Sequence, residues 1–331
     1  MSTIMPIHRR GFLQLAGSAA ALGMSGSGAA IAQGAYPSKP VRFIVGFPAA
    51  GPNDVLARLM AEWLTAKLGQ PFVVENQPGK AGNIATEAVA RAPADGHTIL
   101  LCGPANAIGA ALYPDLPFNF LRDFAPVGGI TREALVMVVN PSLPVTNAAE
   151  YLAYARANPG KLKMASTGNG SAPHVTAELF RMLTGVETNI VHYAGGGAAL
   201  KAIIAGEAQV MFEPMSASIE PVRKGQLRAV AVTTTARSAA LPNVPPLAET
   251  VPGYEASATT GVAVPKGTPR AVVELLNRTM NAAFSDAGMR AKLLDTGGEP
   301  LPGSPEDFTK VMEGETAKWG DVVKRSGAKA E

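Results

Sequence analysis

The sequence predicts an α/β protein of two lobes, each built on a mixed or mostly parallel β-sheet, joined by a two-strand hinge with a ligand cleft between the lobes. Residues 41–102 are predicted to form strand, helix, strand, helix, strand, and residues 162–233 repeat this alternation. Such alternation predicts parallel strands with right-handed crossovers. A chain of 331 residues also exceeds the size of one ordinary core, which favours two lobes.

The first lobe opens with a strand, a loop and a helix. Residues 41–45 are rich in β-branched and aromatic side chains, which is typical of a buried strand. Residues 53–68 show apolar positions at helical spacing, and Gly69 is placed to end that helix. The small residues of the loop between them allow close backbone approach, and the first helical amides lack internal partners. This loop is therefore a predicted site for a carboxylate or phosphate.

Loops after the strands of the first lobe are expected to meet at one edge of its sheet. Ligands of open α/β sheets bind outside the carboxyl ends of the strands, which groups loops 47–54, 76–83 and 103–106. Asp54 either contacts an amine or hydroxyl of the ligand or stabilises the start of its helix, and we favour the second alternative. The candidate ligand contacts from this lobe are Phe47, Pro48, Ala49, Asn53, Asp54 and Asn106.

The second lobe offers a facing loop. A strand at 162–166 leads into the Gly-rich stretch 167–173, and a helix follows from 174 to 183. His174 either faces the cleft or bonds to nearby backbone, the commoner outcome for such a histidine. The candidate ligand contacts here are Thr167, Gly168, Asn169, Gly170, Ser171 and His174.

Two apolar strands are expected to cross between the lobes. These crossings lie near 135–140 and 259–264, and a two-strand hinge allows closure around a ligand. The predicted first lobe consists of residues 36–136 and 263–331, and the second lobe of residues 140–258.

The first 32 residues have the features of a cleavable twin-arginine signal peptide. Arg9 and Arg10 precede a weakly apolar run, and Ala30-Ile31-Ala32 is a small-x-small cleavage site. No later stretch offers about 20 consecutive apolar residues. We therefore expect an exported, soluble mature protein.

Composition excludes several classes of function. Without residues 1–32 the chain has 27 basic and 26 acidic residues, a net charge of +1, which argues against nucleic acid as a partner. The single Cys102 is expected to be a buried, inert thiol. The four histidines lack metal-ligand spacing, and no Walker, dinucleotide or nucleophile-elbow motif occurs. We expect no metal, no cofactor and no enzyme activity, although a hydrolase with an unrecognised acid/base pair stays open.

Short motifs along nearly the whole mature chain carry a family resemblance. They lie at residues 36–42, 47–54, 73–79, 95–98, 112–114, 139–144, 157–162, 166–170 with His174, and 318–319. Together and in this order they resemble the Bug/TctC solute receptors, the extracytoplasmic binding proteins of tripartite tricarboxylate transporters.

The resemblance implies a monomeric, type II-like periplasmic binding protein. It would close on a small organic carboxylate, held mainly by backbone groups and ordered water from loops 47–54 and 167–171, and deliver it to membrane permease subunits. Water-bridged contacts of this kind need not be weak. A ligand-sensing adaptor for a membrane sensor is the alternative, and dicarboxylates, tricarboxylates, amino acids and aromatic acids all stay open as ligands.

Several positions depart from the pattern of the family. The family usually has Gly at the position of Ala50, Lys or Arg at that of Ala194, and Asp at that of Glu213. Glu213 is the last of the candidate ligand contacts. It commonly has Asn at Pro214 and Asp at Gln209. Loss of a cation at 194 either changes how the far end of the ligand is recognised or removes a surface salt bridge.

Overall fold

The computed structural model describes residues 36–238 and 240–329. The signal peptide predicted at residues 1–32 lies outside these residues. The chain divides into one unit at residues 1–38 and a compact second unit at residues 39–331, and the fold of the second unit is described by itself.

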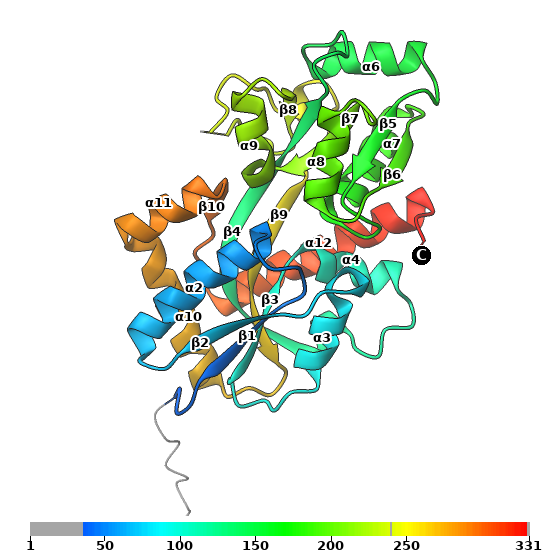
Figure 1. The fold of residues 1–331 in the computed structure, drawn as a ribbon. Helices are drawn as coiled ribbons and strands as arrows, with labels where there is room; N and C mark the ends of the chain where they lie inside the picture. Colours follow the sequence, from blue (N-terminus) through cyan, green and yellow to red (C-terminus); the bar gives the residue numbers. More distant parts are fainter. Residues whose placement is uncertain (1–35, 239, 330–331) are drawn as a thin grey trace, which may run out of the picture. The chain divides into compact units, whose positions relative to one another are not determined.

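One curled sheet of ten strands organises this unit (Figure 1). Its strands follow the order β2-β1-β3-β9-β4-β7-β5-β6, and β10 and β8 both pair with β4. The strands are β1 (Val41–Val45), β2 (Phe72–Asn76), β3 (Thr98–Cys102), β4 (Phe124–Val139), β5 (Lys163–Ser166), β6 (Asn189–His192), β7 (Val210–Pro214), β8 (Arg228–Val232), β9 (Ser257–Pro265) and β10 (Gly298–Pro300).

The long strand β4 runs through two regions of this sheet. Residues 124–134 of β4 pair with β9 and, with β1, β2, β3 and β10, form what we call the first sheet region. Residues 135–139 pair with β7 and β8 and, with β5 and β6, form the second sheet region. The predicted parallel pairing is confirmed, since β1 is parallel to β2 and β3 and β5 is parallel to β6 and β7. The lobe boundaries and the hinge motion stay predictions.

The sequence identified only the second part of β4. Apolar residues run without a break from Leu135 to Val139, whereas Pro126, Gly128 and Gly129 interrupt the pattern before them. The pairing with β9 shifts register twice in that earlier part, between Pro126 and Gly128 and between Gly129 and Thr131. Proline and glycine are typical of such bulges and weaken the strand signal in the sequence.

Helices cover the sheet on both faces. They are α2 (Pro52–Leu68), α3 (Asn83–Ala90), α4 (Pro104–Leu112), α5 (Phe120–Asp123), α6 (Ala148–Ala157), α7 (Ala172–Thr184), α8 (Gly196–Ile204), α9 (Met215–Arg223), α10 (Arg270–Ser285), α11 (Ala287–Asp295) and α12 (Pro305–Ser326), with 3-10 turns η1 (Lys80–Gly82) and η2 (Leu247–Glu249). The pattern Ser-Pro-Glu-Asp at residues 304–307 predicts a helix start. The structure confirms it, since the Ser304 side chain caps α12 by accepting a hydrogen bond from the Asp307 amide. The pair Thr268-Pro269 predicts a helix capped by Thr268, whereas α10 begins one residue later, after Pro269.

The hydrophobic core extends through both sheet regions. Side chains such as Ile44, Leu100 and Leu135 belong to one cluster with the aromatic rings of Phe180 and Phe212, whose centroids lie 5.5 Å apart. Cys102 is buried in this cluster, and burial raises the pKa of its thiol to about 12, as expected for an inert thiol.

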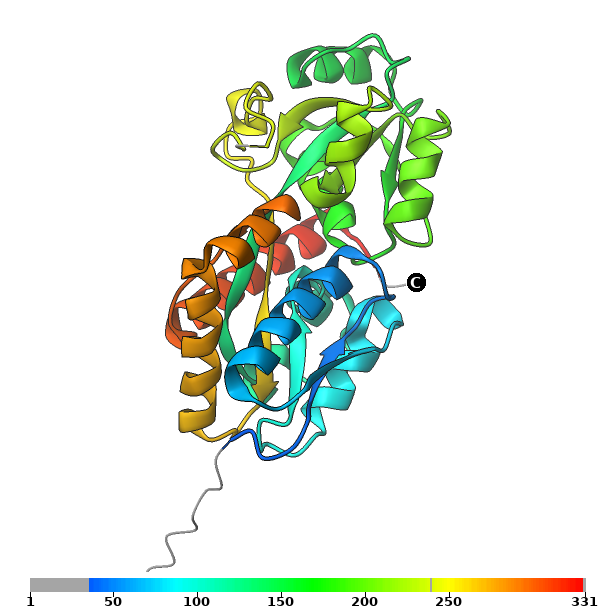
Figure 2. The same ribbon diagram turned by 60° about the vertical axis from the view of Figure 1, so that its left-hand side comes forward.

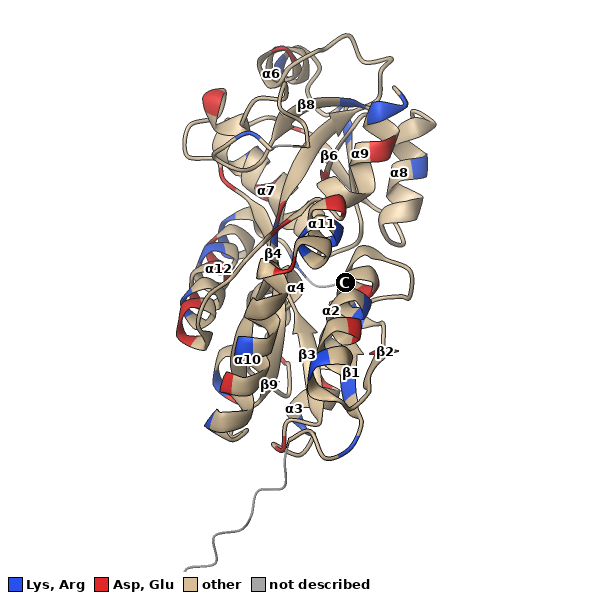
Figure 3. Cartoon of the chain, turned by 90° about the vertical axis from the view of Figure 1, so that its left-hand side faces the viewer, with Lys and Arg blue, Asp and Glu red and all other residues tan. Residues whose placement is uncertain are grey.

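Helix α12 packs against α4, β4 and α7, so it contacts both sheet regions. Figure 3 shows basic and acidic positions interspersed along α12 and α10, which fits the nearly neutral charge balance. Within residues 36–238 and 240–329 no helix is both long and apolar enough to span a membrane.

Candidate functional site

The N-terminus of α2 leaves its first amides without helical partners. The first helical hydrogen bond runs from the Val55 amide to the Gly51 carbonyl, 3.0 Å away, so the amides of Asn53 and Asp54 precede it. Gly51 occupies the N-cap position, and no side chain caps this helix. Figures 1 and 2 both show this end of α2, in dark blue, directed toward the second sheet region. The arrangement is one that favours a bound anion.

Asp54 fastens the loop that precedes α2. Its Oδ2 atom accepts hydrogen bonds from the Ala50 amide at 2.8 Å and from Nε of Arg58 at 2.9 Å. Burial raises the pKa of the Asp54 carboxyl, but the bonds from Arg58 and Ala50 outweigh burial, and the net pKa is lowered. These are the contacts that a helix-stabilising role requires, and contact between Asp54 and a ligand stays a prediction.

Residues with left-handed backbone conformation lie in this loop and in the neighbouring turn at 79–82. Ala50 has a φ of 62°, which explains why glycine suits this position better than alanine does. Four consecutive residues, 79–82, also have positive φ, with values of 132°, 47°, 52° and 87°. A Cβ atom placed on Gly46 would lie 2.7 Å from Cα of Gly82. The turn at 79–82 therefore packs directly, backbone on backbone, against the start of the first loop.

Residues 103–106 do not form the open loop that the sequence predicts, because α4 begins at Pro104. Proline is well suited to the first helical position, and the small residues after it continue the helix. The Asn106 side chain is used inside the protein: Oδ1 accepts from the Gly103 amide at 2.9 Å, and Nδ2 donates to Oγ1 of Thr86 at 2.8 Å. Asn106 thus stabilises the start of α4, and its contact with a ligand stays a prediction.

The second loop, residues 167–171, is held by its own side chains. The Gly170 amide donates to Nδ1 of His174 at 3.0 Å, which is the backbone contact expected as the commoner role of this histidine. Ser171 caps α7 by accepting from the His174 amide, and its hydroxyl donates to the Gly168 carbonyl at 2.7 Å. Nδ2 of Asn169 donates to the Lys329 carbonyl at 2.6 Å, which ties the loop to the residues after α12.

Both loops contact the same neighbouring turn. A Cβ atom placed on Gly170 would lie 2.6 Å from Cδ2 of Leu112 and 3.9 Å from Cβ of Ala81. Ala81 belongs to the turn that packs against Gly46, and Phe47 lies 3.6 Å from a Cβ atom placed on Gly82. The structure therefore places loops 47–54 and 167–171 both close to the turn at 79–82. A ligand cavity shared by these loops stays a prediction.

Glu213 lies at the carboxyl end of β7, with 3% of its surface exposed. Its Oε1 atom is 3.0 Å from a Cβ atom placed on Gly196, and Cγ2 of Thr167 is 3.8 Å from the same position. Three segments that follow or end neighbouring strands thus meet at Gly196, the first residue of α8. The sequence predicts a helix from about residue 198 to residue 205 after the triple glycine at 195–197, and α8 begins two residues earlier, at Gly196.

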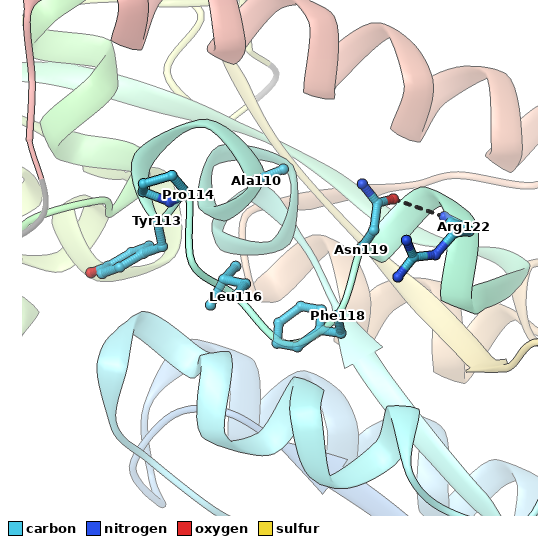
Figure 4. A pocket seen from close by; sticks show the side chains of 7 residues that line it. All are labelled: Ala110, Tyr113, Pro114, Leu116, Phe118, Asn119 and Arg122. Atoms are coloured by element: carbon cyan, nitrogen blue, oxygen red, sulfur yellow. Dashed lines mark hydrogen bonds between the residues drawn. The ribbon is translucent and has the colours of Figure 1, made fainter.

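Two hollows of the unit lie away from the predicted contacts. One cavity of about 230 Å³ lies beside the end of α4 and is drawn in Figure 4, where Arg122 and Asn119 are joined by a hydrogen bond. A shallower hollow of about 610 Å³ lies between α2 and β2. Among the described residues, no group of three His, Cys, Asp or Glu side chains could hold a metal ion.

Comparison with known proteins identifies the fold. The chain is 36% identical to protein BugT of Bordetella pertussis over 308 residues, 92% of this chain and 94% of that protein. The structure of R. palustris Rpa4515 with adipate is 37% identical with a TM-score of 0.83, covering 88% of this chain and 98% of that one. MatC of Rhodopseudomonas palustris, with bound malate, is 29% identical with a TM-score of 0.79, covering 87% and 100%.

These likenesses span both sheet regions. The fold is therefore the two-lobed α/β fold of periplasmic binding proteins, as the sequence predicts. A family model described as the tripartite tricarboxylate transporter family receptor matches residues 56–328. The chain belongs to this family of TctC-type solute receptors.

Proposed function

We propose that this protein is a periplasmic receptor that captures a small organic carboxylate and delivers it to the membrane subunits of a tripartite tricarboxylate transporter. The observation that carries the proposal is the uncapped start of α2, where the Asn53 and Asp54 amides lack helical partners. A carboxylate bound there gains hydrogen bonds from backbone amides and a favourable interaction with the helix dipole. The relatives whose structures hold adipate and malate support this class of ligand.

The remaining parts of the proposal concern capture and export. Members of this family are solute-binding receptors, and this chain is a receptor and not an enzyme. Loops 47–54 and 167–171 close on the ligand when the sheet regions move about β4 and β9. The twin-arginine signal at residues 1–32 exports the folded protein, which works as a monomer in the periplasm.

A panel of organic acids tests the function. The Tm of the mature protein, residues 33–331, is measured with adipate, malate, a tricarboxylate, an aromatic acid and an amino acid in turn. Each acid that raises the Tm is then studied by titration calorimetry to obtain its Kd. We expect saturable stabilisation of several degrees by at least one acid, about 3 kcal/mol at a hundredfold excess over Kd. Recovery of each acid unchanged distinguishes binding from turnover. Stabilisation by none of the acids would contradict the proposal.

One substitution separates binding from folding. Asn53→Asp places a carboxylate beside the free amides of α2, where it favours the helix but repels an anionic ligand. We expect Tm to stay equal or rise while the affinity for the acid falls about tenfold or more. Asn147→Asp is the matched control, because Asn147 is the N-cap of α6 and aspartate caps equally well. An unchanged affinity in Asn53→Asp would place the carboxylate elsewhere.

A further inference from the structure

Glu213 is a buried acid that lacks a protein partner on one oxygen. Its side chain is 3% exposed, and Oε2 accepts no hydrogen bond from any residue that the structure describes. Oε1 lies 3.0 Å from the position of a Cβ atom added to Gly196, at the point where α8 begins beside Thr167. A buried polar atom without a partner is costly, so this carboxyl is placed to make a hydrogen bond with something the chain does not supply.

A second carboxyl group lies close to it on β4. Oε1 of Glu133 accepts a hydrogen bond from the Ser216 amide at 2.6 Å, near the start of α9. Burial raises the pKa of Glu213 to about 8, and the charge of Glu133 adds to the effect. Burial raises the pKa of Glu133 to about 7, and its bond to Ser216 opposes that rise. The bond from the Ser216 amide therefore favours the charged form of Glu133.

Each element around this pair presents one group. Strand β4 contributes Glu133, α9 contributes Ser216, and α8 contributes the backbone of Gly196. The loop after β5 contributes the methyl group of Thr167, and the turn before β10 contributes Gly297, where an added Cβ atom would lie 3.3 Å from Oε1 of Glu133. The ionisable group among these is Glu133, and it disfavours a negative charge on Glu213.

We propose that Glu213 binds the far end of the ligand as a neutral carboxylic acid, donating a hydrogen bond to an oxygen of a second carboxylate. The inference rests on the proposed function and assigns the side chain that recognises the second carboxylate of a ligand such as adipate. The near carboxylate lies at the amides of Asn53 and Asp54, and the far one lies where Thr167, Gly196 and Glu213 meet.

A ligand with an ammonium group fits the site less well. It would require Glu213 to ionise beside Glu133, whose bond from the Ser216 amide favours its own charged form. One ligand cation would then face two buried carboxylates. A neutral donor at Glu213 leaves a single charge on the pair and satisfies the oxygen that lacks a partner.

Calorimetric titration of the mature protein with adipate tests the inference. Between about pH 7 and about pH 9.5, we expect the affinity of the wild type to fall about tenfold per pH unit once Glu213 loses its proton. In Glu213→Gln the amide supplies a donor that does not titrate, so its affinity should vary less than about twofold over this range. Glu220→Gln changes an exposed acid on α9 and should keep the wild-type profile.

The other outcomes separate the inference from the function. If adipate binds the wild type and Glu213→Gln with the same pH profile, the inference is overturned and the receptor function stands. Loss of adipate binding in a folded Glu213→Gln protein shows that a neutral amide donor cannot replace the acid, which also overturns it. If only amine-bearing acids bind, the dicarboxylate class is wrong. Binding of no carboxylate at all overturns both proposals.

Discussion

The amide of Gly170 donates a hydrogen bond to Nδ1 of His174, 3.0 Å away, inside the second loop. His174→Ala leaves this buried amide without an acceptor, which should lower the free energy of unfolding by about 1–3 kcal/mol. His174→Asn keeps an acceptor near the same position and should recover part of the loss. Urea denaturation of the three proteins measures the effect, and equal midpoints for wild type and His174→Ala would contradict it.

Glycine at 170 is required for conformation and for space. Its φ is 75°, and an added Cβ atom would lie 2.6 Å from Cδ2 of Leu112. Gly170→Ala should therefore cost about 1–3 kcal/mol of stability and weaken ligand binding by pushing the loop away from α4.

Gly314→Ala is the matched control for this change. Gly314 lies within α12 with nothing within 4 Å of an added Cβ atom, so the same substitution should stabilise the protein by about 0.5–1 kcal/mol. A fall in Tm for Gly170→Ala and a rise in Tm for Gly314→Ala would confirm the role of Gly170. A fall in Tm for both variants would show that alanine is destabilising at either position.

The last residues of the chain should support the second loop. Deleting residues 327–331 removes the Lys329 carbonyl, which accepts the 2.6 Å hydrogen bond from Asn169. We expect a loss of about 0.5–1.5 kcal/mol in stability and a faster release of ligand. Asn169→Ala should cause a similar loss, and the two changes combined should cost less than their sum. Full additivity in this double-mutant cycle would show that the bond contributes nothing.

Glu213 should make stability depend on pH. Its pKa is about 8 in the folded protein against an ordinary value of 4.5, so the unfolded chain releases this proton at lower pH than the folded one. Stability of the wild type therefore falls as the pH rises from about 4.5 to about 8 and then levels off. Glu213→Gln should be more stable than wild type by about 1–3 kcal/mol at pH 8, and the gain should vanish near pH 4.5. A gain that is the same at every pH would contradict the burial argument.

The sequence was informative where local pattern decides the structure. The strand, loop and helix at 41–68 were identified because the hydrophobic period changes from strand-like to helical across a Gly/Pro-rich loop. Ser304 was recognisable as a cap, since it is a short polar residue followed three positions later by an acidic one. For α6 the sequence left Thr146 and Asn147 as alternative caps, and the structure has Asn147 in that position.

Contacts between residues that are far apart in the sequence could not be predicted from local patterns. The contact of Glu133 with the Ser216 amide joins residues 83 positions apart, and no local signal marks Glu133 as a neighbour of Glu213. The start of β4 was missed because its bulges contain proline and glycine, and α4 because its Gly103-Pro104 opening resembles a loop. The hydrogen bond between Asn169 and Lys329 likewise depends on where α12 ends.

The placement of Lys329 affects how the protein should be labelled for study. Its carbonyl group holds Asn169 of the second loop, so a purification tag, fluorescent protein or surface tether joined after Glu331 begins two residues from a bond that shapes the candidate site. Proteins tagged at that end should show altered ligand kinetics, and a cleavable tag placed ahead of residue 33 avoids the interference. For a biosensor the same position is an advantage, because a dye attached there would sense movement of the loop.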